Sequence, residues 1–156
     1  MSRVSEFQAD RQKLNELVMK YAGRNTKRFY SVDWQAYEPG ALPGKTKELL
    51  GLVASLVLRC DDCVTYHVIN CFEAGVSDGE IEEALGIGLV VGGSITIPHL
   101  RRAFRTWDEL KSSRQTAGNP EAEKPRATAD ERRRHKRHGL NVQRDGRSLR
   151  IRRGEI

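Results

Sequence analysis

The sequence predicts an all-α protein. Apolar residues recur at three- and four-residue steps through most of the first 110 positions, and helix-start and helix-stop signals separate these runs. Charged residues make up 31% of the 156 positions and aromatic residues only 6%, a composition that suits a helical protein better than a sheet-rich one. No segment before residue 112 has a convincing strand pattern. We therefore expect a bundle of about five helices, in a chain about as long as one ordinary domain.

The first helix is expected to begin at the segment "SEFQ", where Ser5 and Gln8 have capping-box spacing, and to end near Gly23. Its apolar positions are Phe7, Leu14, Leu17, Val18 and Tyr21. The segment that follows, "FYSVDWQAYEPGALPG" at 29–44, is predicted to be a connector whose aromatic side chains pack on the body of the protein.

Four further helices follow from the apolar periodicity and its interruptions. One begins at Thr46 and is apolar on most sides, which predicts a central position. The next covers about 61–74 and ends at Gly75, and a fourth begins with the capping box "SDGE" at Ser77 and runs through Val91. The segment "GGS" interrupts the pattern, and 95–110 forms the last helix, with a proline in its first turns.

The positive charge of the chain is concentrated at its C-terminal end. The net charge is +6, yet residues 1–110 carry 13 Lys and Arg against 15 Asp and Glu, whereas residues 111–156 carry 14 against 6. Residues 112–138 are poor in apolar side chains and are expected to be a linker or a solvated helix. The segment 140–151 is a candidate β-hairpin, because Asp145-Gly146 suits a type I′ turn.

These patterns divide the chain into three segments. Residues 1–39 hold the first helix and the connector, residues 40–112 the helical domain, and residues 113–156 a basic C-terminal arm with a possible hairpin.

All three cysteines lie within the fourteen residues "LRCDDCVTYHVINC" at 58–71. On a helix, Cys60, Cys63, His67 and Cys71 form one continuous stripe. A Cys-x-x-Cys pair at a helix start can close a small disulfide ring, and the helix dipole favours the thiolate there. His67, one turn after Cys63, is placed to take a thiol proton, and Glu48 on the preceding helix could orient it.

Other interpretations of the same residues stay open at this point. Cys60, Cys63 and His67, with His99 as a fourth ligand, could hold zinc. Cys71 is expected to be a small buried core residue. Glu48 could instead be an exposed residue paired with a neighbouring lysine, Lys45 or Lys47.

The combination of Glu48, Cys60-Asp-Asp-Cys63, His67 and the segment "EAGVSDGEIEEAL" resembles the carboxymuconolactone decarboxylase-like superfamily, in particular its alkyl hydroperoxidase D-like branch. The resemblance covers about residues 40–112. It implies that Cys63 is the peroxide-reactive cysteine, that Cys60 closes the disulfide, and that His67 and Glu48 form a proton relay. Asp62 departs from the pattern, because the best-characterised hydroperoxidase of this branch has a second relay histidine there.

The activity that the resemblance implies is a thiol-dependent peroxidase or disulfide oxidoreductase with an antioxidant role, an alkyl hydroperoxidase-like enzyme that needs no metal, haem or flavin. Its expected partners are a hydroperoxide substrate, a dithiol or lipoyl-type reductant protein, and further copies of the chain in a trimer or hexamer. The decarboxylases that give the superfamily its name lack the cysteine pair, which disfavours decarboxylation. Alternatives are a thiol-disulfide exchange protein or redox sensor without peroxidase turnover, a family member of other activity, or a binding protein whose function lies in the basic arm.

The remaining features of the sequence bear on the location of the protein in the cell and on nucleic-acid binding. No secretory signal or membrane span is recognisable, so a reducing cytoplasmic location is expected, where a close cysteine pair is more often catalytic or metal-binding than structural. The basic segment "ERRRHKRH" at 131–138 has no interleaved aromatic residues. Nucleic-acid binding is therefore disfavoured.

Overall fold

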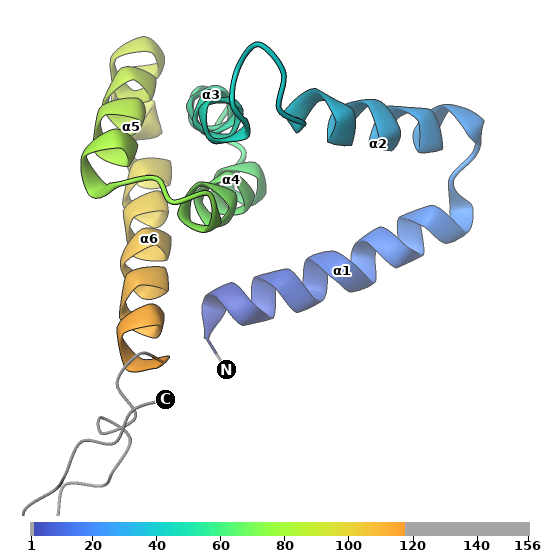
Figure 1. The fold of residues 1–156 in the computed structure, drawn as a ribbon, viewed down its shortest axis with the longest axis horizontal. Coiled ribbons are helices and arrows are strands. Elements are labelled where there is room, and N and C mark those ends of the chain that lie inside the picture. Colours follow the sequence, from blue (N-terminus) through green and yellow to red (C-terminus); the bar gives the residue numbers. More distant parts are fainter. Residues whose placement is uncertain (1, 118–156) are drawn as a thin grey trace, which may run out of the picture. The chain divides into compact units, whose positions relative to one another are not determined.

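The computed structural model describes residues 2–117, which form six α-helices, one 3-10 turn and no strand (Figure 1). The predicted all-α class is confirmed for this part of the chain. Most of the predicted basic arm and the whole candidate hairpin at 140–151 lie outside the described residues. No helix within the described part is long and apolar enough to cross a membrane.

The N-terminal region differs from the prediction in two ways. Helix α1 spans Arg3–Tyr21 and is capped by Ser2 instead of Ser5. The supposed connector is largely a second helix, α2, spanning Arg24–Tyr37. The helix forms because neither proline nor glycine interrupts these fourteen residues, and the Pro39-Gly40 pair follows only after its end.

The expected packing of the aromatic residues of this segment on the body was also wrong for most of them. Phe29 and Trp34 on α2 are 70% and 68% exposed. Tyr37, at the last position of α2, is the half-buried exception, and it contacts the imidazole of His67.

The four helices predicted after residue 44 are present. They are α3 (Gly44–Val57), α4 (Asp61–Glu73), α5 (Asp78–Gly92) and α6 (Ile97–Ala117), with the 3-10 turn Ser94–Thr96 before α6. The capping box at Ser77 forms as expected, and Gly75 adopts a positive φ of 73° after α4. Helix α6 continues seven residues beyond the predicted end.

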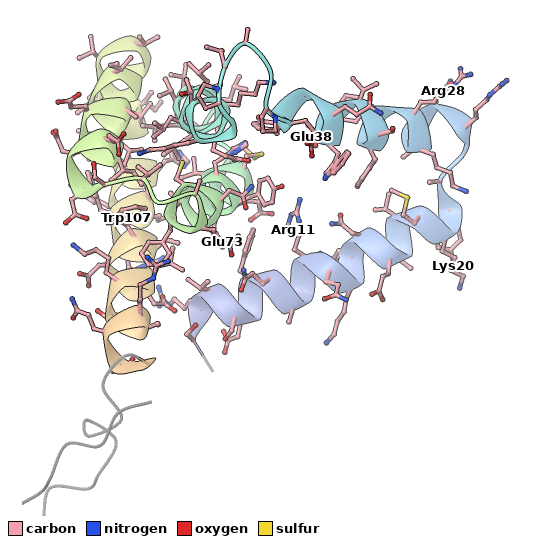
Figure 2. All side chains as sticks on the ribbon, in the orientation of Figure 1. Arg11, Lys20, Arg28, Glu38, Glu73 and Trp107 are labelled. Carbon is pink, nitrogen blue, oxygen red and sulfur yellow. A yellow bond between two sulfur atoms is a disulfide. The ribbon has the colours of Figure 1, made fainter. Side chains whose placement is uncertain are left out.

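The hydrophobic core lies among α3, α4, α5 and α6, where α3 packs against α4 and α5, and α4 also packs against α6 (Figure 1). Phe72 of α4 and Trp107 of α6 stack edge to face, with ring centroids 5.3 Å apart, and the Trp107 indole donates to Asp78 at the start of α5 (Figure 2). These contacts hold α4 in place between its neighbours. The buried core residues are Leu52, Leu56, Val64, Val68, Cys71, Val76, Ile81, Leu85, Ala103 and Trp107.

Helix α1 joins this core at two points. Val4 is buried and its backbone N–H donates to Glu109 of α6 at 3.1 Å. The guanidinium of Arg11 lies 4.0 Å from the ring centroid of Tyr66 on α4, and Figure 2 shows its side chain extending from α1 toward that helix. Helix α1 thereby covers one side of the segment that carries the cysteines.

Candidate active site

The two neighbouring cysteines are joined in a disulfide at the start of α4, with their Cα atoms 5.3 Å apart. Cys60 is the N-cap of the helix, and its sulfur accepts the backbone N–H of Cys63 at 3.4 Å. This N–H group of the first turn therefore acts directly on the sulfur of Cys60, and in the reduced protein such a contact favours the thiolate. Cys63 is exposed to solvent and Cys60 is half-buried.

A tight turn between α3 and α4 places Cys60 at this position. The N–H of Arg59 bonds the carbonyl of Leu56, and the N–H of Cys60 bonds that of Ser55, the paired hydrogen bonds of a Schellman motif. Arg59 occupies the left-handed position, with φ of 60°, where glycine is the usual residue. Cys60 is thus both the last residue of the turn that ends α3 and the N-cap of α4.

His67 forms a buried pair with Glu48. The imidazole Nδ1 lies 2.8 Å from a carboxylate oxygen of Glu48, and the two side chains are only 8% and 13% exposed. Because a carboxylate only accepts, Nδ1 carries the hydrogen and donates it to Glu48. In the neutral form of such a ring, Nε2 is the proton acceptor.

The lysines that might have neutralised Glu48 bind elsewhere. Lys45 pairs with Glu80 of α5 at 2.8 Å. Lys47 donates to the backbone carbonyls of Ala36 and Glu38, at 2.8 and 2.6 Å, where the positive charge also suits the C-terminal end of α2. Glu48 is therefore a partner of the imidazole instead of an exposed helix residue.

Tyr37 also contacts the imidazole. It lies in the segment predicted to be a connector, for which the sequence indicated only that aromatic side chains pack on the body and assigned no role in the site. Its hydroxyl is 3.4 Å from Nε2 of His67, and the two rings are 5.2 Å apart. Burial raises the pKa of Tyr37, and the nearby charges of Glu48 and Asp33 raise it further. The phenol consequently remains a hydrogen-bond donor at neutral pH.

Gly51 on α3 provides the space in which these rings meet. A Cβ atom at this position would lie 2.6 Å from Cε1 of His67 and 2.7 Å from the hydroxyl of Tyr37. A glycine inside a helical pattern is the sequence signal for such a close approach, although it does not say what approaches.

The disulfide and the imidazole open into one cavity of about 380 Å³. Cys63, Tyr66 and His67 line it from α4. Helices α1 and α2 supply the other walls, so the segment 1–39 belongs to the site as much as the helical domain does. The remaining lining residues are Phe7, Asp10, Arg11, Leu14, Asn15, Asp33, Tyr37 and Asp62. A larger cavity of about 550 Å³ between α1 and α4 includes neither cysteine.

The two aspartates between the cysteines have different surroundings. Asp61 binds Nδ1 of His99 at 2.6 Å and also the guanidinium of Arg102, both on α6. Burial of the carboxyl raises its pKa, but the hydrogen bonds from Arg102 and His99 outweigh that effect and hold the pKa below its ordinary value. Asp62 is exposed and lines the cavity beside Cys63.

His99, considered as a fourth zinc ligand, is thus engaged by Asp61. Within residues 2–117, no group of three or more His, Cys, Asp or Glu side chains is arranged to hold a metal ion. Cys71 is fully buried in the core, and its burial, together with the charge of Glu48, raises the pKa of its thiol to about 12.

These features define a helical protein with a Cys-x-x-Cys disulfide at a helix start and a buried glutamate-histidine pair at the same cavity. The sequence model of the Carboxymuconolactone decarboxylase family matches residues 24–106, and the chain belongs to this family. The match includes α2, which carries Tyr37.

Solved structures of the same family resemble the chain closely. Two crystal structures of a Thermotoga maritima protein superpose with TM-scores of 0.70 and 0.69, at 55% and 54% identity, and cover 71% and 73% of this chain and 97% of that one. One of them is described as a carboxymuconolactone decarboxylase family protein with a suggested part in the antioxidative response. A Legionella pneumophila family member shares the fold at 23% identity, with a TM-score of 0.65 over 70% of this chain and 98% of that one.

Two bacterial proteins described as uncharacterised are also similar in sequence. One, from Cupriavidus necator, is 27% identical over 84 residues, which cover 54% of this chain and 74% of that protein. The other, from the cox locus of Paracoccus denitrificans, is 24% identical over 82 residues, which cover 53% and 74%.

Proposed function

We propose that the protein is a thiol-dependent hydroperoxidase in which Cys63 reacts with the peroxide, Cys60 closes the disulfide, and Glu48 and His67 move the proton. The observation that carries the proposal is the buried contact between His67 and Glu48 at the cavity that Cys63 lines. The suggested antioxidative part of the Thermotoga maritima protein supports the same assignment.

The cycle starts from the reduced dithiol. His67 accepts the Cys63 proton, and Glu48 stabilises the imidazolium that forms. The thiolate attacks a hydroperoxide oxygen, so that an S–O bond forms, the O–O bond breaks, and the alkoxide leaves as an alcohol with the proton from His67. Cys60 then attacks the sulfenic acid on Cys63, which forms the disulfide and releases water. A dithiol protein, of the lipoyl type in our proposal, returns two electrons and two protons.

Rapid-mixing kinetics on the reduced protein test this proposal. The parent and Cys71→Ala should consume about one equivalent of hydroperoxide and lose two thiols per chain, which a dithiol restores. Cys63→Ser should lose the fast reaction, whereas Cys60→Ser should stop at a sulfenic acid that a dimedone probe traps. A parent rate no faster than that of Cys63→Ser would refute the peroxidase.

A second candidate function, thiol-disulfide exchange without peroxide turnover, has its own support. Cys60 is the N-cap of α4, and its sulfur accepts a hydrogen bond from the backbone N–H of Cys63. In the reduced protein this contact favours a Cys60 thiolate that can attack other disulfides. Reduction of a small aromatic disulfide by the parent and by Cys60→Ser separates the two functions. The exchange function requires fast reduction that depends on Cys60 and an unaccelerated reaction with peroxide.

We further propose that the working form is a homo-oligomer. Helix α5 and the 3-10 turn that follows it expose large apolar side chains, and exposed apolar surface of this extent typically marks an interface. These side chains are Ile87, Val90, Val91 and Ile95, which are 59%, 84%, 68% and 59% exposed. Light scattering coupled to size-exclusion chromatography should give three or six chains, and Val90→Glu should reduce that number. A monomeric parent would refute the oligomer.

A further inference from the structure

We propose that Tyr37 is the third member of the proton relay, the residue whose hydroxyl passes the proton between Cys63 and Nε2 of His67. This inference rests on the proposed role of Cys63 and His67 and extends the relay to α2. Of the two ring nitrogens, Nδ1 is occupied by Glu48, so a proton from the cavity has to reach Nε2. The hydroxyl of Tyr37 lies at that nitrogen, 3.4 Å away.

Two features of α3 hold Tyr37 in its position. Lys47 donates to the carbonyls of Ala36 and Glu38, the residues on either side of Tyr37, and thereby fixes the end of α2 against α3. Gly51 leaves open the space that the phenol and the imidazole share. The hydroxyl is therefore held in place by α3, and both rings line the cavity of Cys63.

The proton path can be written atom by atom. In the resting relay, the Tyr37 hydroxyl donates to Nε2 while Nδ1–H donates to Glu48. The Cys63 thiol transfers its proton to the phenol oxygen as the phenol hydrogen moves to Nε2. The new O–H of Tyr37 then donates to the Cys63 thiolate, and its oxygen accepts from the imidazolium. Tyr37 in this way stabilises the ion pair besides connecting its two ends.

Several charged or titratable groups face this relay from the helices around it. Glu48 lies on α3, Asp33 on α2, Asp62 and Tyr66 on α4, and Asp10 and Arg11 on α1. The acidic groups oppose a free thiolate, which makes a hydrogen-bond donor directed at the sulfur more important. Titration of any of these groups also enters the pH profile, so the experiment compares variants that retain all of them.

The experiment measures how fast Cys63 of the reduced full-length protein reacts with iodoacetamide between pH 5 and 10, in the Cys60→Ser, Cys71→Ala background. The variant is Tyr37→Phe, which removes only the hydroxyl. The matched control is Tyr30→Phe, the same change two turns earlier on α2. We expect Tyr37→Phe to shift the midpoint of thiolate formation upward by about one pH unit, the effect of losing one hydrogen bond to a charged group. Tyr30→Phe should leave the midpoint in place.

The same variants, with both active-site cysteines present, are then mixed with hydroperoxide. Tyr37→Phe should react about tenfold more slowly at pH 7, because a midpoint one pH unit higher leaves about one tenth as much thiolate, and should recover as pH rises toward the ordinary thiol value. A uniform loss at every pH would mean that Tyr37 only supports the structure.

The outcomes separate the two proposals. If the parent does not reduce peroxide but its alkylation midpoint still depends on Tyr37, the relay stands and the peroxidase fails. If the alkylation profiles of the parent and Tyr37→Phe superpose, the role of Tyr37 is overturned whatever the peroxidase result.

Discussion

Glu48 and His67 are 19 residues apart in the chain, and their side chains meet at 2.8 Å in a buried pair between α3 and α4. A carboxylate placed behind an imidazole keeps one ring nitrogen protonated and leaves the other as a base. Cys63 and His67 line the same cavity, and this is the basis of the thiol-activating relay that we propose.

The charge of Glu48 should matter more than its hydrogen bond. Glu48→Gln keeps an oxygen that can accept from Nδ1 but removes the charge that stabilises the imidazolium. We expect the rate of Cys63 oxidation by hydroperoxide at pH 7 to fall about 100-fold, as measured by rapid mixing. Glu83→Gln, an exposed glutamate of α5, is the matched control. Rates within twofold of the parent would remove Glu48 from the relay.

Gly51→Ala should damage the site and the fold together. The added methyl group would lie 2.6 Å from Cε1 of His67, and such overpacking costs about 1–3 kcal/mol, which exceeds the helix-propensity gain of alanine. We expect a lower urea midpoint and a slower reaction with peroxide.

Gly86→Ala is the matched control for this change, because it has no heavy atom within 4 Å of the added Cβ in α5. It should stabilise the protein by about 0.5–1 kcal/mol. Equal midpoints for both variants would contradict the close packing at Gly51.

Cys71 should stay unreactive in the folded protein. Its side chain is fully buried and the pKa of its thiol is raised to about 12, so almost no thiolate exists near neutral pH. After reduction, we expect an aromatic disulfide reagent at pH 8 to titrate two thiols per chain rapidly and the third only in denaturant. Cys71→Ala should keep the two rapid thiols and lose the third. Three rapid thiols in the native parent would be inconsistent with this core position.

The stabilising contribution of Asp61 should be lost in acid. Its pKa in the folded state is depressed, because the hydrogen bonds from Arg102 and His99 outweigh the effect of burial. The contribution to stability is therefore present above the unfolded value, about 3.9, and is lost as the pH falls through the folded pKa. In urea unfolding, the difference between the parent and Asp61→Asn should be largest near pH 6 and shrink below about pH 4.

Asp108→Asn, an exposed aspartate of α6, is the control for this titration. A difference between the parent and Asp61→Asn that stays constant between pH 6 and pH 3 would show that the ion pair contributes nothing.

Much of the helical core could be predicted from the sequence because its signals are local. The apolar steps of α3, the capping box at Ser77 and the left-handed Gly75 each depend on residues within a few positions of one another. Helix α2 was missed because its serine, valine and aromatic residues have middling helix propensity. The helix forms nevertheless, because no helix breaker lies between Gly23 and Pro39.

The sequence by itself determined the residue types of the site: two cysteines at disulfide spacing, a histidine one turn later and a glutamate on the helix before. Only the tertiary structure decided the partners. Glu48 binds His67 instead of Lys45 or Lys47, which bind other groups. His99 binds Asp61, and Tyr37 of α2 contacts the imidazole of His67. The physical reason is that spacing along a helix fixes which side chains share a face, whereas the packing of one helix on another fixes which faces meet.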